Sequence, residues 1–257
     1  MVITDISVII KPKTGIIVKG GLKSMNEIIR KRKSIRKYDP AKLDAATLDM
    51  VRAEIGSVKP LYPGIRYSIE ITDKTKGMFG VSAPHYLLFR SEEKDGSLEN
   101  IGFIGQQMDL FLSGAGLGSC WQGMAKPEDK DESALPFVIC MAFGKPAEPL
   151  HREISEFKRK PLGEISEGDD ERLEAARLAP SGMNAQNWYF VAESGKIHCY
   201  RKKPGALRGL MTSRLSHIDM GIALCHIVEE SEDFSFVKEA GAPARKGCVY
   251  AGTVTGA

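Results

Sequence analysis

Residues 179–188 read Ala-Pro-Ser-Gly-Met-Asn-Ala-Gln-Asn-Trp, between a helix-like apolar run, Leu173–Leu178, and a strand-like run, Trp188–Val191. Pro180 ends the helix, because proline and the residue before it resist helical continuation. The turn formers that follow present hydroxyl, amide and backbone N–H groups: Ser181, Gly182 and Asn184. We therefore expect a loop that suits a flat ligand rich in hydrogen-bonding groups.

A second segment far upstream is strongly basic. Residues 30–37 contain six Lys or Arg side chains in eight positions. We expect a short helix over Asn26–Lys37, on which Arg32 and Arg36 share a face. Three interpretations stay open: a solvated helix face, a nucleic-acid or nuclear-import patch, and a phosphate site. The nucleic-acid interpretation is disfavoured because no other segment is basic and aromatic together.

Together the two segments resemble the nitroreductase superfamily, which is FMN-dependent and NADH-oxidase-like. Five motifs, from about residue 25 to the C-terminus, carry the resemblance: Arg32, Ser34 and Arg36; Pro180, Ser181, Asn184, Gln186 and Trp188; Ala83-Pro84; Gly116-Leu117-Gly118; and Lys158-Arg159-Lys160-Pro161-Leu162. Each motif is weak alone, and the five together are fairly specific.

The chain departs from the family pattern in two ways. Asn187 stands where the family usually has proline, and the Pro-Ser loop lies near the end of the chain instead of soon after the first helix. This order resembles a branch in which two half-subunits in one chain imitate the usual homodimer. The resemblance thus implies an α+β, nitroreductase-like fold with a mixed, mostly antiparallel sheet and long central helices. We expect an N-terminal extension over 1–24, a first half over 25–163 and a second half over 164–257.

The pattern of elements agrees with two equivalent halves. Helical spacing and alternation predict helices over 48–58 and 98–115 and strands over 67–72, 86–89 and 137–143. The second half repeats this order with helices over 170–178 and 215–229 and strands over 188–193 and 248–255. Within the extension, Val8–Ile10 and Ile16–Val18 predict a β-hairpin, and we expect this extension to be dispensable.

Bulk composition is that of an ordinary globular protein. The 257 residues are 42% hydrophobic and 27% charged, with a net charge of +3. These values give no argument for nucleic-acid or membrane partners, and no apolar run approaches the ~20 residues that span a bilayer. The five cysteines are widely spaced, which disfavours zinc and disulfides. We expect buried free thiols in a reducing cytoplasm and no bound metal.

The resemblance also implies roles for particular residues. Arg32, Lys33, Ser34 and Arg36 would anchor the FMN phosphate, with Arg159 and Lys160 completing the anion site. The ring system would be held by the later loop, through Pro180, Ser181, Gly182, Asn184 and Gln186, and backbone N–H groups of Leu117 and Gly118 would lie near the flavin edge. Without the resemblance, these features indicate a surface charge run, a capped turn and a glycine helix stop. A dinucleotide-binding loop at 114–118 is rejected, because a helix precedes it where that fold needs a strand.

No acid–base pair stands out, and we expect the flavin to carry the chemistry without a catalytic side chain. His217 and Asp219 are two apart on a helix, point to different faces, and suggest a helix-surface or interface role. Cys120 and Trp121 suggest core positions.

The sequence therefore predicts an FMN-dependent oxidoreductase of nitroreductase type. Hydride would pass from NADH or NADPH to the flavin, and then to a nitroaromatic, a quinone or a similar small-molecule acceptor. One alternative is a non-catalytic flavin-binding or sensing protein on the same fold. Another is a different enzyme on this scaffold, such as a dehalogenase or a flavin-fragmenting enzyme. The protein would be a monomeric pseudo-dimer or a homodimer.

Overall fold

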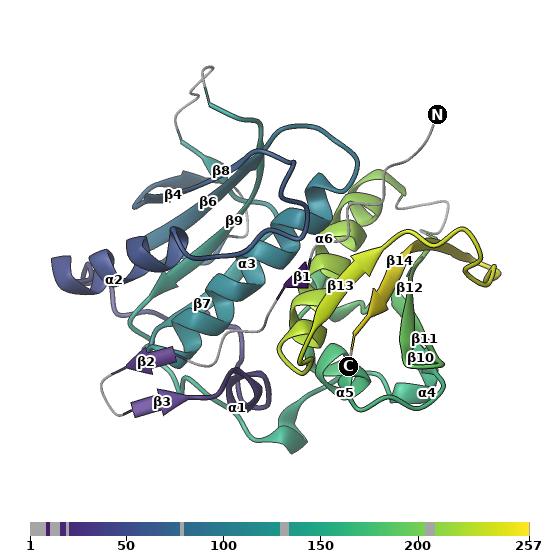
Figure 1. Ribbon diagram of the computed structural model, residues 1–257. Helices are drawn as coiled ribbons and strands as arrows, with labels where there is room; N and C mark the ends of the chain where they lie inside the picture. The colour runs from purple at the N-terminus through teal and green to yellow at the C-terminus, as the bar shows by residue number, and fades with distance from the viewer. Residues whose placement is uncertain are drawn as a thin grey trace.

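Two antiparallel sheets with the same strand order organise the molecule (Figure 1). The computed structural model describes residues 9–10, 16–18, 21–77, 80–128, 134–203 and 209–256. In these residues one sheet has the order β4-β6-β9-β7 and the other contains the order β11-β12-β14-β13, with every pairing antiparallel. The strands are β4 (Tyr67–Thr72), β6 (His85–Ser91), β7 (Gly118–Gln122), β9 (Phe137–Gly144), β11 (Trp188–Glu193), β12 (Lys196–Lys202), β13 (Phe234–Val237) and β14 (Cys248–Thr255). The predicted α+β fold with two equivalent halves is confirmed.

Short strands extend these sheets at their edges. In the second sheet, β10 (Ser166–Glu167) pairs in parallel with β11, and β1 (Ile9–Ile10) pairs with β13. Two small antiparallel pairs stand apart: β2 (Ile16–Val18) with β3 (Gly21–Lys23), and β5 (Thr75–Lys76) with β8 (Lys126–Pro127). The predicted hairpin between 8–10 and 16–18 is therefore wrong, because β1 pairs with an available sheet edge instead. Residues 1–8, 11–15 and 19–20 of the predicted extension lie outside the described residues, and the predicted boundaries between the halves stay predictions.

Two long helices lie side by side between the sheets (Figure 1). They are α3 (Ser97–Gly114) and α6 (Gly209–Val228). A Cβ on Gly102 would collide with the backbone carbonyl oxygen of Ile218, and a Cβ on Gly221 would collide with that of Glu99. Each helix thus contributes one glycine that lets the other approach closely. The contact is reciprocal, as an approximate two-fold axis between the halves requires.

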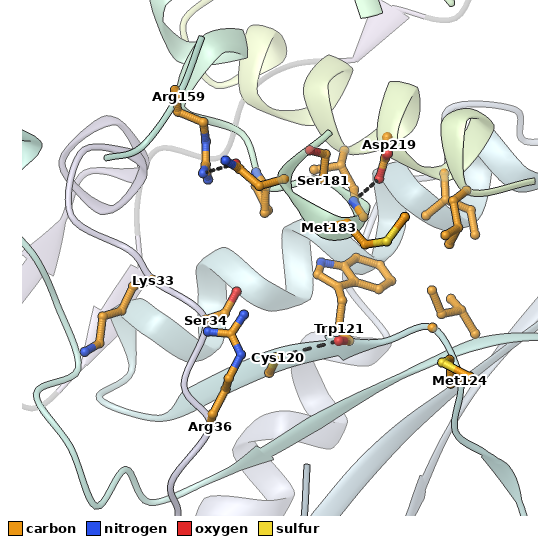
Figure 2. Close-up of a pocket in the computed structure, with 18 of the residues that line it drawn as sticks. Lys33, Ser34, Arg36, Cys120, Trp121, Met124, Arg159, Ser181, Met183 and Asp219 are labelled. Atoms are coloured by element: carbon orange, nitrogen blue, oxygen red, sulfur yellow. Dashed lines mark hydrogen bonds between the residues drawn. The ribbon is translucent and has the colours of Figure 1, made fainter. Parts of the chain in front are cut away.

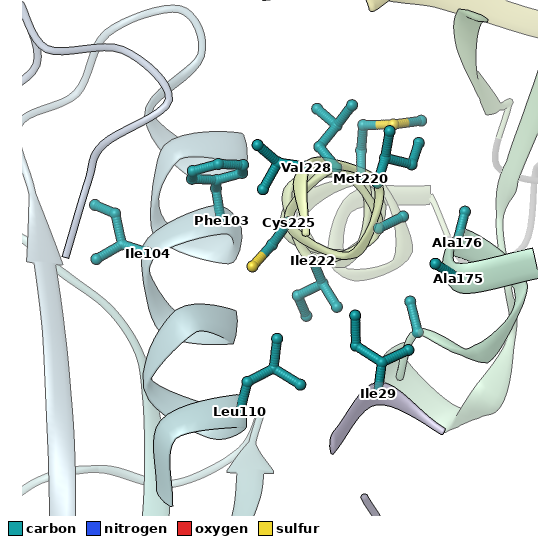
Figure 3. Close-up of a cluster of buried hydrophobic side chains, with 14 of the residues drawn as sticks. Ile29, Phe103, Ile104, Leu110, Ala175, Ala176, Met220, Ile222, Cys225 and Val228 are labelled. Atoms are coloured by element: carbon teal, nitrogen blue, oxygen red, sulfur yellow. The ribbon is translucent and has the colours of Figure 1, made fainter. Parts of the chain in front are cut away.

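The hydrophobic core continues across this helix pair. Figure 3 shows α6 end-on, with Phe103 and Leu110 of α3 on one side and Ala175 and Ala176 of α5 (Arg172–Leu178) on the other. All four of these side chains are buried in one cluster. Because the two halves share one core, we infer that neither half is stable alone.

The remaining helices are short, and one is shorter than predicted. They are α1 (Met25–Ile29), α2 (Ala45–Ile55) and α4 (Leu162–Ile165). Asp44 caps α2 by accepting a hydrogen bond from the Thr47 backbone N–H at 2.8 Å. None of the helices in the described residues has the length and apolarity that a membrane crossing requires.

The predicted helix over Asn26–Lys37 ends at Ile29, so the expected shared helical face of Arg32 and Arg36 is wrong. The Arg32 N–H still donates to the Ile28 carbonyl at 2.8 Å, but beyond Arg32 the segment bonds to other segments: the Ile35 N–H donates to the Ser119 carbonyl at 2.9 Å, and the Lys37 carbonyl accepts from Ala147 at 2.9 Å. These bonds to neighbouring segments replace the i to i−4 pattern of a helix.

Candidate functional site

A cavity of about 710 Å³ lies where the two halves meet (Figure 2). The first half contributes the segment after α1 and the residues around the end of β7. The second half contributes the loop between α5 and β11 and one face of α6. The residues that line it are Lys33, Ser34, Arg36, Cys120, Trp121, Gly123, Met124, Ile139, Glu148, Arg152, Arg159, Pro180, Ser181, Gly182, Met183, Asn184, Leu215, Ile218, Asp219 and Ile222.

An extended segment brings Ser34 and Arg36 to this cavity. Ile35 is fully buried, while its two neighbours line the cavity, as alternation along extended backbone requires. Gly118 explains how the segment fits, because a Cβ there would lie 2.8 Å from the Cβ of Ile35. Gly118 packs behind this segment, and neither it nor the buried Leu117 lines the cavity.

Arg32 lies behind the cavity wall in a buried polar network. Its Nε forms an ion pair with Asp109 Oδ2 at 2.9 Å, and both side chains are about fully buried. Its Nη2 donates to Ser34 Oγ at 3.3 Å, and Ser119 Oγ donates to Asp109 Oδ1 at 2.5 Å. The Arg32 guanidinium therefore holds Ser34 in place through Nη2, and its buried Nη1 has no hydrogen-bond partner among the described residues.

Guanidinium groups are concentrated on one side of the cavity. Burial lowers the pKa of Arg159 to about 9 and that of Arg152 to about 10, and the charge of the neighbouring Arg32 contributes to both shifts. Arg159 donates to two neutral oxygens, Asn184 Oδ1 at 2.5 Å and the Leu178 carbonyl at 3.2 Å. Such crowding of like charges favours a bound anion, and guanidinium groups suit a phosphate.

The loop between α5 and β11 has an unusual backbone. Met183, Asn184 and Gln186 have φ angles of 53°, 55° and 46°, in the left-handed region that costs non-glycine residues free energy. Two of its own side chains hold it: Ser181 Oγ accepts from the Gln186 N–H at 2.9 Å, and Asn184 Nδ2 donates to the Lys158 carbonyl at 2.6 Å.

Gln186 and Lys160 complete this support. Gln186 is fully buried, and its Oε1 accepts from the Lys160 N–H at 2.7 Å. Lys160 Nζ donates to the Ala185 carbonyl at 2.6 Å. Loops held in such conformations are typical of functional sites.

The opposite side of the cavity is largely apolar. In Figure 2, Trp121, Met183 and Met124 lie apart from Lys33, Arg36 and Arg159. The Trp121 ring stacks on Phe89 with centroids 5.6 Å apart, and its Nε1 donates to Gln106 Oε1 at 3.3 Å. The indole is thereby fixed as a flat wall.

One carboxyl group lies on this apolar side. Asp219 of α6 is 3% exposed, and its Oδ1 accepts from the Gly182 backbone N–H at 2.8 Å. Burial raises its pKa to about 7. His217 points elsewhere and contacts Glu99 at 2.5 Å. The prediction that the two side chains face differently is confirmed. Of the predicted helix-surface or interface role, the surface alternative is wrong for Asp219, which is buried where the two halves meet.

The structure brings most of the predicted site residues together. Eight line the cavity: Lys33, Ser34, Arg36, Arg159, Pro180, Ser181, Gly182 and Asn184. Five others stand behind it: Arg32, Leu117, Gly118, Lys160 and Gln186. The ligand-binding roles of all thirteen stay predictions.

Sequence reasoning missed Trp121, Arg152 and Asp219 as cavity residues. Trp121 and Asp219 were visible as an aromatic residue after the glycine turn and as a lone carboxylate in an apolar helix. Arg152 lies in a polar connector that gives no such signal. In the described residues, no three His, Cys, Asp or Glu side chains gather as metal ligands would.

The strand order, the central helix pair and the cavity between the halves define a nitroreductase-type α+β fold. The chain belongs to the family described as "Putative TM nitroreductase", whose model matches residues 24–231. No curated protein sequence matches the chain.

The chain is similar to several solved structures, and the first of those below shows the same fold. A "putative nitroreductase" from Thermotoga maritima is 22% identical, with a TM-score of 0.59 over 90% of this chain and 92% of that one. An "FMN-dependent nitroreductase" from Clostridium difficile is 17% identical, with a TM-score of 0.40 over 51% of this chain and 93% of that one. A "putative NAD(P)H:FMN oxidoreductase" from Staphylococcus epidermidis is 15% identical, with a TM-score of 0.45 over 58% and 97%.

Proposed function

We propose that the protein is an FMN-dependent oxidoreductase that takes hydride from NADH or NADPH and reduces a nitroaromatic, a quinone or a similar acceptor. The observation that carries this proposal is the two-sided cavity, with guanidinium groups on one side and an apolar wall containing Trp121 on the other. FMN has matching parts, a phosphate dianion and a flat ring system. Membership of a nitroreductase family supports the same conclusion.

The residues present fit such a group. Arg159 Nε, on the cavity wall, is a buried donor without a hydrogen-bond partner among the described residues, and so is Arg32 Nη1 behind the wall. A buried donor without a partner costs free energy, which a phosphate oxygen would recover. The cavity volume of about 710 Å³ also falls within the range of ~300–1,000 Å³ that is usual for ligand sites.

Each side of the cavity then has a distinct task. Lys33, Ser34, Arg36 and Arg159 would hold the phosphate, with Arg152 adding positive charge. The loop of Pro180, Ser181, Gly182 and Asn184 would hold the ring system against Trp121. The apolar residues of α6 would exclude water. FMN, when bound, supplies the hydride chemistry, so the protein needs chiefly to bind and orient.

The first experiment is an absorption spectrum of purified protein after addition of FMN and desalting. Retained bands near ~370 and ~450 nm are expected of a bound oxidised flavin. Anaerobic addition of NADH or NADPH should bleach them, and a quinone should restore them. Retention without bleaching by either nucleotide would favour the non-catalytic flavin-binding alternative. Failure to retain FMN would overturn the proposal.

Arg36 offers a sharp test of the phosphate site, because among the described residues no side chain forms a hydrogen bond or ion pair with its guanidinium. Arg36→Ala should weaken FMN binding about ten-fold or more, since a hydrogen bond to a charged group is worth roughly 1.5–3 kcal/mol. Riboflavin, which lacks the phosphate, should bind both proteins with similar affinity.

The matched control is Arg52→Ala, which removes the same charge from an exposed pair on α2. It should leave FMN and riboflavin affinity unchanged. An equal loss of FMN and riboflavin binding in Arg36→Ala would show that this side of the cavity does not recognise phosphate.

A further inference from the structure

The two halves contain equivalent hydrogen bonds between the central helix and a loop. Asn100 lies two residues before Gly102, and its Oδ1 accepts from the Tyr62 backbone N–H at 2.9 Å. Asp219 lies two residues before Gly221, and its Oδ1 accepts from the Gly182 backbone N–H at 2.8 Å. Both loops connect a helix to the first strand of their sheet's shared strand order. An amide is therefore sufficient for this bond, and the structural task does not require a carboxyl group at position 219.

The second carboxyl oxygen of Asp219 is available to a ligand. Among the described residues, no group donates a hydrogen bond to Oδ2 and no cation pairs with it. The side chain is 97% buried in the protein yet lines the cavity, on the side away from Lys33, Arg36 and Arg159. Burial favours the protonated form of this carboxyl, with a pKa of about 7.

The groups around Asp219 do not form an ion pair with its carboxyl group. Gly182 contributes only its N–H from the loop, and the nearest cavity residues on α6 are Leu215, Ile218 and Ile222. From β7, Cys120 faces the cavity with a thiol whose pKa burial raises above its usual value. The charged groups that line the same cavity are Lys33, Arg36, Glu148, Arg152 and Arg159.

We propose that Asp219 donates a proton to the acceptor, and that the acceptors served by this site are therefore those that gain a proton on oxygen when reduced, quinones above all. This rests on the proposed function, which supplies the nicotinamide reductant and the flavin. In one turnover NAD(P)H loses a hydride, and the quinone gains a hydride and a proton. The O–H bond of Asp219 breaks, its electron pair stays on the carboxylate, and the proton forms a new O–H bond on the quinone oxygen. Water then returns a proton to the carboxylate.

The principal variant is Asp219→Asn, which keeps the hydrogen bond to Gly182, as Asn100 does to Tyr62, and removes the acidic proton. In stopped-flow experiments with FMN-loaded protein, bleaching by NADH and reoxidation by benzoquinone are measured separately. Reoxidation of the wild type should slow as the pH rises through about 7. In Asp219→Asn, reoxidation at pH 6 should fall about 10²–10⁴-fold, far more than bleaching does. Asp219→Glu should recover part of the loss, because it restores a carboxyl group.

A second readout requires no flavin and no turnover. Infrared difference spectra of the FMN-free protein should show a protonated carboxyl band that titrates near pH 7 and is absent from Asp219→Asn. Absence of this band in the wild type, or equal reoxidation in wild type and Asp219→Asn at every pH, would overturn the assignment of Asp219. Failure of the wild type to retain FMN would instead overturn the proposed function, and the infrared titration keeps the two failures distinguishable.

Discussion

The two halves of the molecule share a backbone plan and differ in what fills the two equivalent positions between them. Both have the same order of four antiparallel strands, a central helix with a contact glycine, and a helix–loop hydrogen bond. At one position the side chains leave a cavity beside Asp219. At the other, Tyr62 and Glu99 stand at the places equivalent to Gly182 and Ile218. The comparison shows that the backbone plan alone does not make a site, and that the side chains decide it.

At this second position, Tyr62 makes a ring contact and Glu99 belongs to an ion cluster. The Tyr62 ring lies against Gly96 and edge-on to Phe236, with centroids 6.3 Å apart. Glu99 lies three residues before Gly102, where the other half has Ile218 three residues before Gly221. Its Oε1 contacts His217 Nδ1 at 2.5 Å and Arg201 Nε at 3.6 Å. A ligand there would meet a carboxylate where the open site offers the apolar side chain of Ile218.

The largest effect on stability should come from the glycine contact between α3 and α6, which the two halves share most closely. Gly102→Ala and Gly221→Ala would each push a methyl group into a backbone carbonyl of the opposite helix. Backbone atoms cannot move aside as a side chain can, so each variant should lose about 3 kcal/mol of unfolding free energy. Urea denaturation measures this loss.

Gly163→Ala in α4 is the matched helical control, because a Cβ there meets nothing within 4 Å. It should change stability by about 1 kcal/mol or less, in the stabilising direction. A large loss in only one of the two central variants would contradict a reciprocal helix contact.

The next largest effect is on the pH dependence of stability, in which Asp219 and the equivalent Asn100 of the other half should differ. Because burial raises the pKa of Asp219 to about 7, the folded protein keeps this proton over a range in which the unfolded chain has lost it. Its contribution therefore destabilises the fold as pH rises from about 4 to 7 and is constant above that. Between pH 5 and pH 8, Asp219→Asn should gain roughly 2–3 kcal/mol relative to wild type.

Asn100→Asp tests the reverse change at the equivalent place in the other half. It should lose stability relative to wild type over the same pH interval, because it buries a new carboxyl group. Urea denaturation at several pH values gives both differences. Parallel stability–pH curves for wild type and Asp219→Asn would show that the carboxyl ionises as readily in the folded protein as in the unfolded chain.

Much of this arrangement could be predicted from the sequence, and the misses have physical causes. The long helix at 98–115 and the strand at 67–72 have strong periodicity, the strand at 137–143 is a continuous apolar run, and all three are confirmed. The helix over Asn26–Lys37 failed because backbone bonds from Ile35 and Lys37 to distant segments outweigh local propensity. No local pattern encodes such a pairing.

The cavity likewise contains residues that local motifs predicted and residues that only the packing of the two halves brings in. The motif residues that line the cavity lie in two short segments with strong turn or charge signals. Trp121 and Asp219 belong to it only through the packing of one half on the other. Their surroundings could not be predicted from their neighbours in sequence. Trp121 packs against the core, as predicted, and also lines the cavity, whereas Asp219 is buried where the halves meet instead of lying on the helix surface.

The smallest effect, a factor of two, tests the comparison most directly. If Tyr62 and the Glu99 cluster close the second position, FMN titration should saturate at one molecule per chain, measured from the flavin released by denaturation and the protein concentration. Arg36→Ala should weaken that one site, with no second tight site in either protein. Two equivalent tight sites would mean that Tyr62 and Glu99 move aside for a ligand. Such a result would leave the shared backbone plan intact and remove the distinction between an open and a closed position.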